Sequence, residues 1–289
     1  MKKLSKIAFI VSAMLLVFAG CEMLDLNIEN STNSPSKSSA NDSSRLMLWI
    51  TDDPALTDYM VEAKITLIKV ELRYLEDSTG QREIVIFEDT MSYDLLSLRN
   101  GIMKKLVDIE VPNGKVDLIR LYVDKASVLL VNGKTTVVKV PSGSQSGIKA
   151  FIDPPLNLRQ DIDNEIIIDF DVEKSFVVRG SGKTVDDVKG FNFKPVLRVE
   201  NKTTSGFVEG KVKDSFSQAI ANAKVSISSD SLTATAFSDS SGYYAISALP
   251  AGMYSMFSAK DAYDTVRVEE VIINAGDGTV QNFKLNLLE

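Results

Sequence analysis

The sequence contains no histidine and a single cysteine, Cys21, and both scarcities restrict the chemistry open to the chain. Zinc sites are built almost always from cysteine and histidine side chains. The Ser-His-Asp and Cys-His nucleophile systems need an imidazole base. Acid–base chemistry would therefore fall on carboxylates, lysines or tyrosines. We expect a protein that is not an enzyme and that holds no cofactor and no metal.

Long apolar runs are also scarce, and the one at the start is too short to cross a membrane. Residues 7–18 are almost wholly apolar, but a transmembrane helix needs about 20 such residues. Three lysines precede this run, and Ala19-Gly20-Cys21 follows it, which is the residue order of a secretory signal. A cysteine at the cleavage point resembles the lipobox of bacterial lipoproteins, although Phe18 stands where leucine is usual. The resemblance implies a signal peptide at 1–20 and acylation of Cys21, palmitate included.

Basic residues are fewer than acidic ones, 32 against 39, which gives a net charge of −7. Removal of residues 1–20 would take away three lysines and no carboxylate, so the mature chain would be more acidic. Nucleic-acid binding depends on lysine and arginine neutralising phosphates, and anionic membranes attract basic segments. We therefore expect no nucleic-acid partner, and membrane attachment only through the lipid anchor.

Residues 21–44 are expected to form a flexible tether that carries the acylated cysteine. The second half of this segment is rich in serine and contains no large apolar residue. Such a composition buries too little surface to offset the entropy of ordering the chain. About two dozen flexible residues would span roughly 25–30 Å, which would lift a folded domain off a membrane surface.

From residue 45 onward, apolar residues recur at every second position, which is the period of a β-strand. Ala63, Ile65 and Leu67 follow one phase, whereas Val70 and Leu72 follow the opposite one. A change of phase inside one strand predicts a β-bulge.

Three further local signals concern turns, a proline and helical segments. Asn132-Gly133 between two apolar runs predicts a hairpin with a type I′ turn. Pro195 within an expected strand at 191–199 predicts an edge position or a bulge. Short helical turns are expected at residues 53–60 and 92–99.

Residues 45–200 resemble a bacterial domain family of unknown function. The start is Thr51-Asp52-Asp53-Pro54, with Asp53 where the family carries alanine. The middle contains Asp94-Leu95-Leu96-Ser97-Leu98, and the end is Lys194-Pro195-Val196. The resemblance covers the whole segment in order and implies no established activity.

Residues 206–289 resemble the carboxypeptidase regulatory-like domain, a transthyretin-like β-sandwich that is grouped with carbohydrate-binding-like modules. The resemblance rests on Gly210-Lys211-Val212-Lys213-Asp214, Asp239-Ser240-Ser241-Gly242-Tyr243-Tyr244 and Leu249-Pro250-Ala251-Gly252-Met253-Tyr254. The resemblance implies that residues 206–289 form a single β-sandwich. Short strands separated by turns every eight to twelve residues independently predict a sandwich here.

Asp169 and Asp171 are the candidate metal ligands. Side chains two residues apart on a strand share a face, so these carboxylates, with Glu173, could bind calcium. The alternative is a solvated acidic face, which we favour. Paired carboxylates could also serve glycoside hydrolysis, but nothing in the sequence places a cleft around them.

The candidate ligand-binding residues are aromatic. Trp49 is the only tryptophan, and its apolar neighbours Leu48 and Ile50 predict a core position. An exposed Trp49 would instead offer a flat ring on which a sugar could stack. Tyr243 and Tyr244 are adjacent in an expected strand and must point to opposite faces, so one belongs to the core and the other could contact a ligand or partner.

We therefore expect an all-β protein of two β-sandwich-like domains, after a signal peptide and a disordered tether. Its expected place is the bacterial cell envelope, lipid-anchored, most readily at the outer membrane. The expected role is a non-catalytic binding or scaffolding module for a glycan or an envelope protein. A structural subunit of a surface assembly is the first alternative, and a carboxylate-dependent enzyme is the second.

Overall fold

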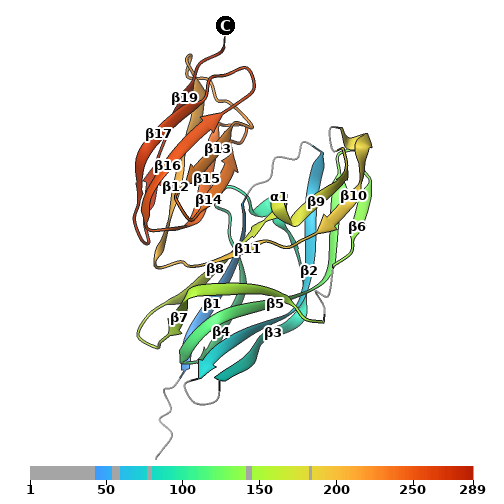
Figure 1. The fold of residues 1–289 in the computed structure, drawn as a ribbon, viewed down its shortest axis with the longest axis vertical. Helices are drawn as coiled ribbons and strands as arrows, with labels where there is room; N and C mark the ends of the chain where they lie inside the picture. The colour runs from blue at the N-terminus through green and yellow to red at the C-terminus, as the bar shows by residue number, and fades with distance from the viewer. Residues whose placement is uncertain (1–42, 54–58, 77–79, 141–144, 182–183, 289) are drawn as a thin grey trace, which may run out of the picture. The chain divides into compact units, whose positions relative to one another are not determined.

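The computed structural model describes residues 43–53, 59–76, 80–140, 145–181 and 184–288. The expected signal peptide, Cys21, nearly all of the tether and most of the helical turn expected at 53–60 lie outside these residues. Residues 41–289 form one compact unit. Within the described ranges the fold is all-β, as predicted (Figure 1). No helix in this part of the chain has the length and apolar character needed to cross a membrane.

The first half of the unit contains two main sheets. One has the strand order β11-β8-β1-β4, in which β1 runs parallel to β8 and antiparallel to β4. Its strands are β1 (Ser43–Asp53), β4 (Lys104–Pro112), β8 (Asn164–Asp171) and β11 (Leu197–Asn201). β8 and β1 are the two inner strands of this sheet, and β8 has buried side chains on both faces. Several of the polar side chains discussed below lie on these two strands.

The second main sheet has the order β3-β2-β5-β6, and β7 also pairs with β5. Its strands are β2 (Met60–Glu76), β3 (Gly80–Asp94), β5 (Gly114–Leu130), β6 (Thr135–Val138) and β7 (Ile148–Leu158). Leu48 and Ile50 from β1 belong to the same buried cluster as Leu72 from β2. The short elements are η1 (Leu95–Leu98), α1 (Val172–Ser175), β9 (Phe176–Gly180), η2 (Val185–Asp187) and β10 (Val188–Phe193).

The predicted bulge in β2 is confirmed. The register of β2 against β3 shifts between Leu67 and Lys69. Leu67 and the core residues before it are buried on one phase, and burial resumes at Val70 on the other. An extra residue at this point lets both apolar phases of the strand face the same core.

The predicted hairpin at Asn132-Gly133 is confirmed, but the predicted turn type is wrong. The Gly133 amide donates to the Leu130 carbonyl at 2.9 Å, and the Leu130 amide donates to the Lys134 carbonyl at 3.0 Å. Gly133 has a φ of +81°, whereas Asn132 does not have a positive φ. A type I′ turn needs a positive φ at both positions, so the loop fits a three-residue turn with a glycine bulge.

Two other expectations for the first half need correction. Pro195 does not sit on an edge strand or in a bulge: residues 191–199 divide into β10 and β11, which belong to different sheets. Proline donates no amide hydrogen bond, so the ladder ends there. The helical turn expected at 92–99 is the shorter η1, because β3 continues to Asp94.

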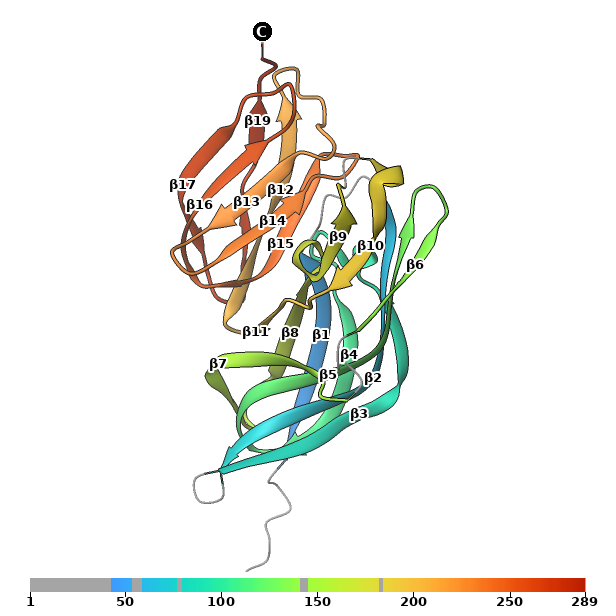
Figure 2. The same cartoon turned by 45° about the vertical axis from the view of Figure 1, so that its right-hand side comes forward.

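The second half of the unit is a β-sandwich, seen in Figure 2 as two facing sheets. One sheet has the order β15-β12-β18, with β19 also paired to β12, and the other has the order β14-β13-β16-β17. Its strands are β12 (Ser205–Asp214), β13 (Lys224–Ser228), β14 (Thr233–Phe237), β15 (Tyr243–Pro250), β16 (Gly252–Ala259), β17 (Val266–Ile273), β18 (Gly278–Val280) and β19 (Phe283–Leu285). Its buried apolar side chains form a cluster separate from that of the first half. The division near residues 201–205 into two independently folding domains stays a prediction.

Candidate functional site

Trp49 lies half-buried on the face of β1 that points away from the core, so its predicted core position is wrong. Its neighbours Leu48 and Ile50 are fully buried on the opposite face. The indole Nε1 donates a hydrogen bond to Glu165 Oε2 on β8, at 2.8 Å. A buried or half-buried indole usually needs such a partner for its N–H group.

The Trp49 ring is not bare, because two lysine ammonium groups lie close to it. Lys202 Nζ is 4.7 Å from the ring centroid and Lys105 Nζ is 5.8 Å from it. Lys202 Nζ also pairs with Glu165 Oε2 at 2.5 Å. One carboxylate therefore joins the indole and one of the cations that lie near its ring. A sugar could stack on Trp49 only by displacing a lysine side chain.

A cavity of about 310 Å³ lies beside this group, and Lys202 is part of its lining. Its aromatic lining residues are Phe207 and Tyr243. Glu209 also lines the cavity and accepts a hydrogen bond from the Tyr243 hydroxyl at 2.8 Å. Partial burial, followed by this hydrogen bond and the charge of Glu209, raises the pKa of Tyr243 to about 12. The cavity thus combines aromatic surface with a cation, a carboxylate and a phenol.

Tyr243 and Tyr244 point to opposite faces of β15, as predicted. Tyr244 is fully buried in the sandwich core, and its hydroxyl donates to the Gln281 carbonyl at 2.5 Å. Tyr243 is the half-buried member that reaches the cavity. Of the aromatic candidates, Tyr243 is therefore the one that a ligand in the cavity can reach. Trp49 does not line the cavity, but its ring contacts Lys202, which does.

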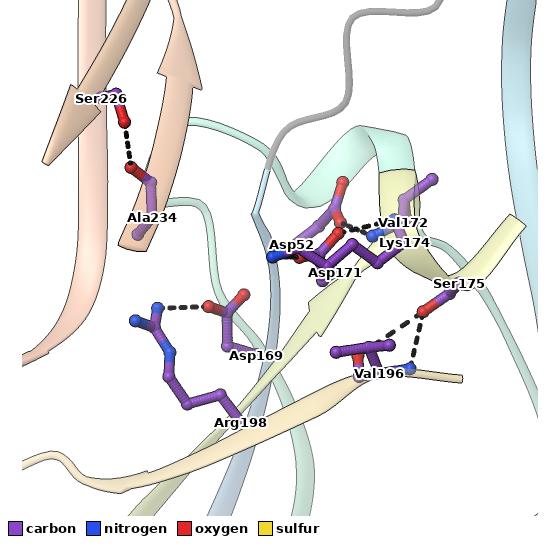
Figure 3. Close-up of polar contacts among 10 residues, drawn as sticks. All are labelled: Asp52, Asp169, Asp171, Val172, Lys174, Ser175, Val196, Arg198, Ser226 and Ala234. Atoms are coloured by element: carbon purple, nitrogen blue, oxygen red, sulfur yellow. Dashed lines mark hydrogen bonds and ion pairs between the residues drawn. The ribbon is translucent and has the colours of Figure 1, made fainter. Parts of the chain in front are cut away.

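Asp169 does not lie on a solvated acidic face, and that expectation is wrong. Its side chain is 6% exposed and pairs with Arg198 of β11, with Nη2 and Oδ2 2.5 Å apart (Figure 3). Burial raises the pKa of Asp169, and the charge and hydrogen bond of Arg198 oppose this shift. The pair therefore holds a carboxylate inside the protein, not at its surface.

Asp171 faces a different partner. Its Oδ1 accepts the Lys174 amide at 2.8 Å at the start of α1, and its Oδ2 accepts the Lys174 ammonium at 2.6 Å. Asp52, buried nearby on β1, accepts the Val172 amide at 3.2 Å (Figure 3). Glu173 lies within α1 and not on the strand, so it does not share a strand face with the other two.

The calcium reading of Asp169 and Asp171 gains no geometric support. Each of the two carboxylates is paired with a cation. The residues described by the structure include no group of three or more acidic, cysteine or histidine side chains placed to hold a metal ion.

The sequence did not single out Lys202, Glu165, Glu209 or Arg198. Lys202 and Glu165 are 37 positions apart, and Arg198 and Asp169 are 29 apart. Only the strand pairing brings them together. A faint signal was present in the unusual position of Glu165 beside the apolar run Ile166–Ile168, where a carboxylate needs a partner.

Comparison with known families assigns the first half. Residues 43–195 match the family described as "Domain of unknown function (DUF4382)". The chain belongs to this family. DUF4382 spans β1 to β10, and therefore includes Trp49, Glu165 and Asp169. Residues 208–286 match a second family, described as the carboxypeptidase regulatory-like domain, which covers the sandwich and Tyr243.

Solved structures resemble the DUF4382 chain only weakly. The shaft pilin SpaA of Lactobacillus rhamnosus GG has a TM-score of 0.29 and 9% identity, over 86% of this chain and 98% of the pilin. The minor pilin GBS52 of Streptococcus agalactiae has a TM-score of 0.25 and 10% identity, over 84% and 96%.

A candidate carbohydrate-binding protein of Bacteroides uniformis has a TM-score of 0.25 and 13% identity, over 27% of this chain. The DUF4382 chain spans only 40% of that protein's length. A search of curated proteins found no match. Similarity at these TM-scores carries no functional inference.

Proposed function

We propose that the protein is a non-catalytic binding module of the bacterial cell envelope, with a glycan as its preferred ligand. The observation that supports this is the cavity lined by Phe207, Tyr243 and Lys202. Sugar sites pair an aromatic surface with a few hydrogen-bonding groups that fix orientation. Tyr243 on β15, Glu209 on β12 and Lys202 in the turn before β12 supply such groups.

A non-catalytic role agrees with the side chains available. The sequence has no histidine, and its cysteine is expected to carry lipid. In the cavity, Glu209 is engaged by a phenol, and the described part of the chain contributes no second carboxylate to its lining. Glycoside hydrolysis needs two carboxyl groups on either side of the bond that is cleaved.

The proposed ligand is tested by titrating the soluble chain, without residues 1–21, with a panel of neutral oligosaccharides. Phe207→Ala and Tyr243→Ala should weaken binding at least about tenfold, because each removes a stacking surface. Phe151→Ala is the matched control, since Phe151 is an exposed phenylalanine that does not line the cavity. Binding that survives both cavity variants would place the sugar elsewhere, and no binding would reject a neutral glycan.

The lipid anchor is a separate part of the proposal and rests on the sequence alone. Acyl chains contribute about 0.8 kcal/mol for each buried methylene, so several chains give stable attachment. Cys21→Ser should release the protein from the membrane fraction or leave an uncleaved precursor. A processed protein that stays membrane-bound with serine at position 21 would disprove the anchor.

A structural subunit of a surface assembly is the second candidate, and β17 favours it. This strand is at the edge of its sheet. Ile272 on β17 is the cross-strand partner of Met253 on β16, and the two are 60% and 66% exposed. Exposed edges with apolar side chains can pair with another chain. Concentration-dependent oligomers that Ile272→Lys abolishes would support this role.

A further inference from the structure

Three lysines converge on one face of the sandwich, next to the Tyr243 cavity, because Lys211 is the cross-strand partner of Tyr243. Lys211 and Lys213 lie two residues apart on β12 and therefore share a face. Lys284 on β19 is the direct partner of Lys213 in the parallel pairing of the two strands. Between them, Val212 and Phe283 point into the core. All three lysines therefore project outward from neighbouring positions.

This arrangement is electrostatically unfavourable in the free protein. Adjacent strands lie about 4.8 Å apart and alternate residues about 6.6 Å apart. Like charges at such positions repel each other. Among the described residues, none of the three lysines forms an ion pair, and the ion pairs found there all lie between residues 45 and 202, outside the sandwich.

The nearby carboxylates are occupied by other groups. Asp214 Oδ1 accepts the amides of Phe216 and Gln218 at 2.9 and 2.8 Å, which closes the turn after β12. Burial works to raise the pKa of Asp239, but hydrogen bonds from Ser241 and Tyr243 and, more weakly, the charge of Lys211 lower it. Neither of these carboxylates, nor Glu209 two residues before Lys211 on β12, forms an ion pair with the three lysines among the described residues, although the charge of Lys211 does act on Asp239.

The three lysines line a groove of about 360 Å³ together with one carboxylate, Asp214, and with Ser217, Asn282 and Phe283. Phe216 follows β12 in the adjacent turn and is 77% exposed. A large, isolated aromatic ring in water contributes nothing to the core. Phe216 is not part of the groove lining, but it precedes Ser217, which is, so a polymer lying in the groove can extend onto the Phe216 ring.

We propose that this groove binds an acidic polysaccharide, with the three ammonium groups on its carboxylate or sulfate groups and Phe216 against a sugar ring. Lysine presents a compact charge on a flexible stem, which suits anions of varied position better than the fixed fork of arginine. In a chain with net charge −7, a local positive cluster is where a polyanion meets least repulsion. The groove shares no lining residue with the neutral-glycan cavity proposed above, although the two are neighbours through Lys211 and Tyr243.

The test uses the lipid-free chain with polygalacturonate and dextran sulfate, and with neutral dextran for comparison. We expect binding to both acidic polymers that weakens with added salt, and no binding to neutral dextran. The triple variant Lys211→Gln, Lys213→Gln, Lys284→Gln should lower affinity about tenfold or more, as the loss of three exposed ion pairs implies. Phe216→Ala should weaken polymer binding and leave the unfolding midpoint unchanged.

The matched control changes Lys134, Lys139 and Lys149 to glutamine, which are exposed and lie outside the groove. It alters net charge equally, so equal losses in both triple variants would reduce the effect to net charge and overturn the proposal. Absence of binding to either acidic polymer would also overturn it. Binding confined to vesicles containing phosphatidylglycerol would reject the polysaccharide in favour of a lipid surface. All variants are first checked for a thermal unfolding midpoint that is no lower than that of the unaltered chain.

Discussion

Arg198 and Asp169 form an ion pair on adjacent strands, and the same arginine nitrogen reaches a third group. Arg198 Nη2 lies 2.5 Å from Asp169 Oδ2 and donates to the Ser247 carbonyl of β15 at 3.3 Å. The two side chains are 19% and 6% exposed. Removing one member of such a pair leaves a charge without compensation inside the protein.

We therefore predict that Arg198→Met destabilises the protein by about 3–5 kcal/mol, measured by urea denaturation. Asp169→Asn in the Arg198→Met background should recover part of this loss, because the unpaired carboxylate is gone. Arg45→Met is the control: its pair with Asp108 is largely solvated, with side chains 61% and 26% exposed. It should cost much less than Arg198→Met, because a solvated pair contributes little to stability. Equal costs for both arginines would show that the burial of Asp169 has no energetic consequence.

The fluorescence of Trp49 should report on Lys202. Since Trp49 is the only tryptophan, its emission is a probe of this one face of the sheet. Lys202→Ala removes the nearer ammonium group, so we predict easier quenching by acrylamide. The cation–π contact contributes about 0.5–1 kcal/mol, and unfolding should become easier by a similar amount. Lys139→Ala should change neither quantity, and unchanged quenching in Lys202→Ala would contradict the observed packing.

Stability should fall in the alkaline range because of Tyr74. Burial raises the pKa of Tyr74 to about 12, against an ordinary value of 10.0. Between these pH values the unfolded chain loses the phenol proton and the folded chain keeps it, so the free energy of unfolding decreases as pH rises. Below pH 10 this contribution is fully present.

The check is urea denaturation at several pH values from about 9 to about 12. Tyr74→Phe removes the titrating group together with its 2.8 Å hydrogen bond to the Pro112 carbonyl. It should lower stability at neutral pH by about 1 kcal/mol and flatten the decline above pH 10. Tyr243, whose pKa is also raised to about 12, accounts for part of the slope that remains. An unaltered slope would assign the alkaline loss to other groups.

Two glycines should respond differently to alanine. Gly133 has a φ of +81° and open space around its missing Cβ. Gly133→Ala should therefore cost about 1–2 kcal/mol from backbone strain alone. At Gly210 an added Cβ would lie 1.8 Å from the Gln281 carbonyl oxygen, which is backbone and cannot turn away. Gly210→Ala should cost about 3 kcal/mol or more, and thermal melts that rank the two in the reverse order would contradict this.

Local sequence patterns predicted the strands well where one face alone was apolar. The opposed phases around Leu67 and Val70 identified the bulge, because burial on a strand leaves a period of two. The same rule failed for Trp49, because β1 carries apolar residues on both faces and alternation no longer distinguishes the core. In the structure the Trp49 indole points toward Glu165, 116 positions away in the sequence, and donates a hydrogen bond to it.

The ion pairs and the lysine groove escaped prediction for a related reason. Lys213 and Lys284 become neighbours only through a parallel pairing that no short segment encodes. Asp169 was predicted to be a surface carboxylate, because its partner Arg198 is distant in the sequence and nothing local indicates burial. Non-local pairing, and not residue type, decides which charges meet.

The order of the sandwich strands along the chain has a kinetic consequence. β12 is the first strand of the sandwich to be synthesised, yet it pairs with β18 and β19, which come last. The Lys211 amide donates a hydrogen bond to Asn282 Oδ1, which lies 71 positions later in the sequence. Contacts of such sequence separation are slow to form. During synthesis, β12 therefore has an unpaired edge on one side, and the sandwich can close only after β18 and β19 have been made.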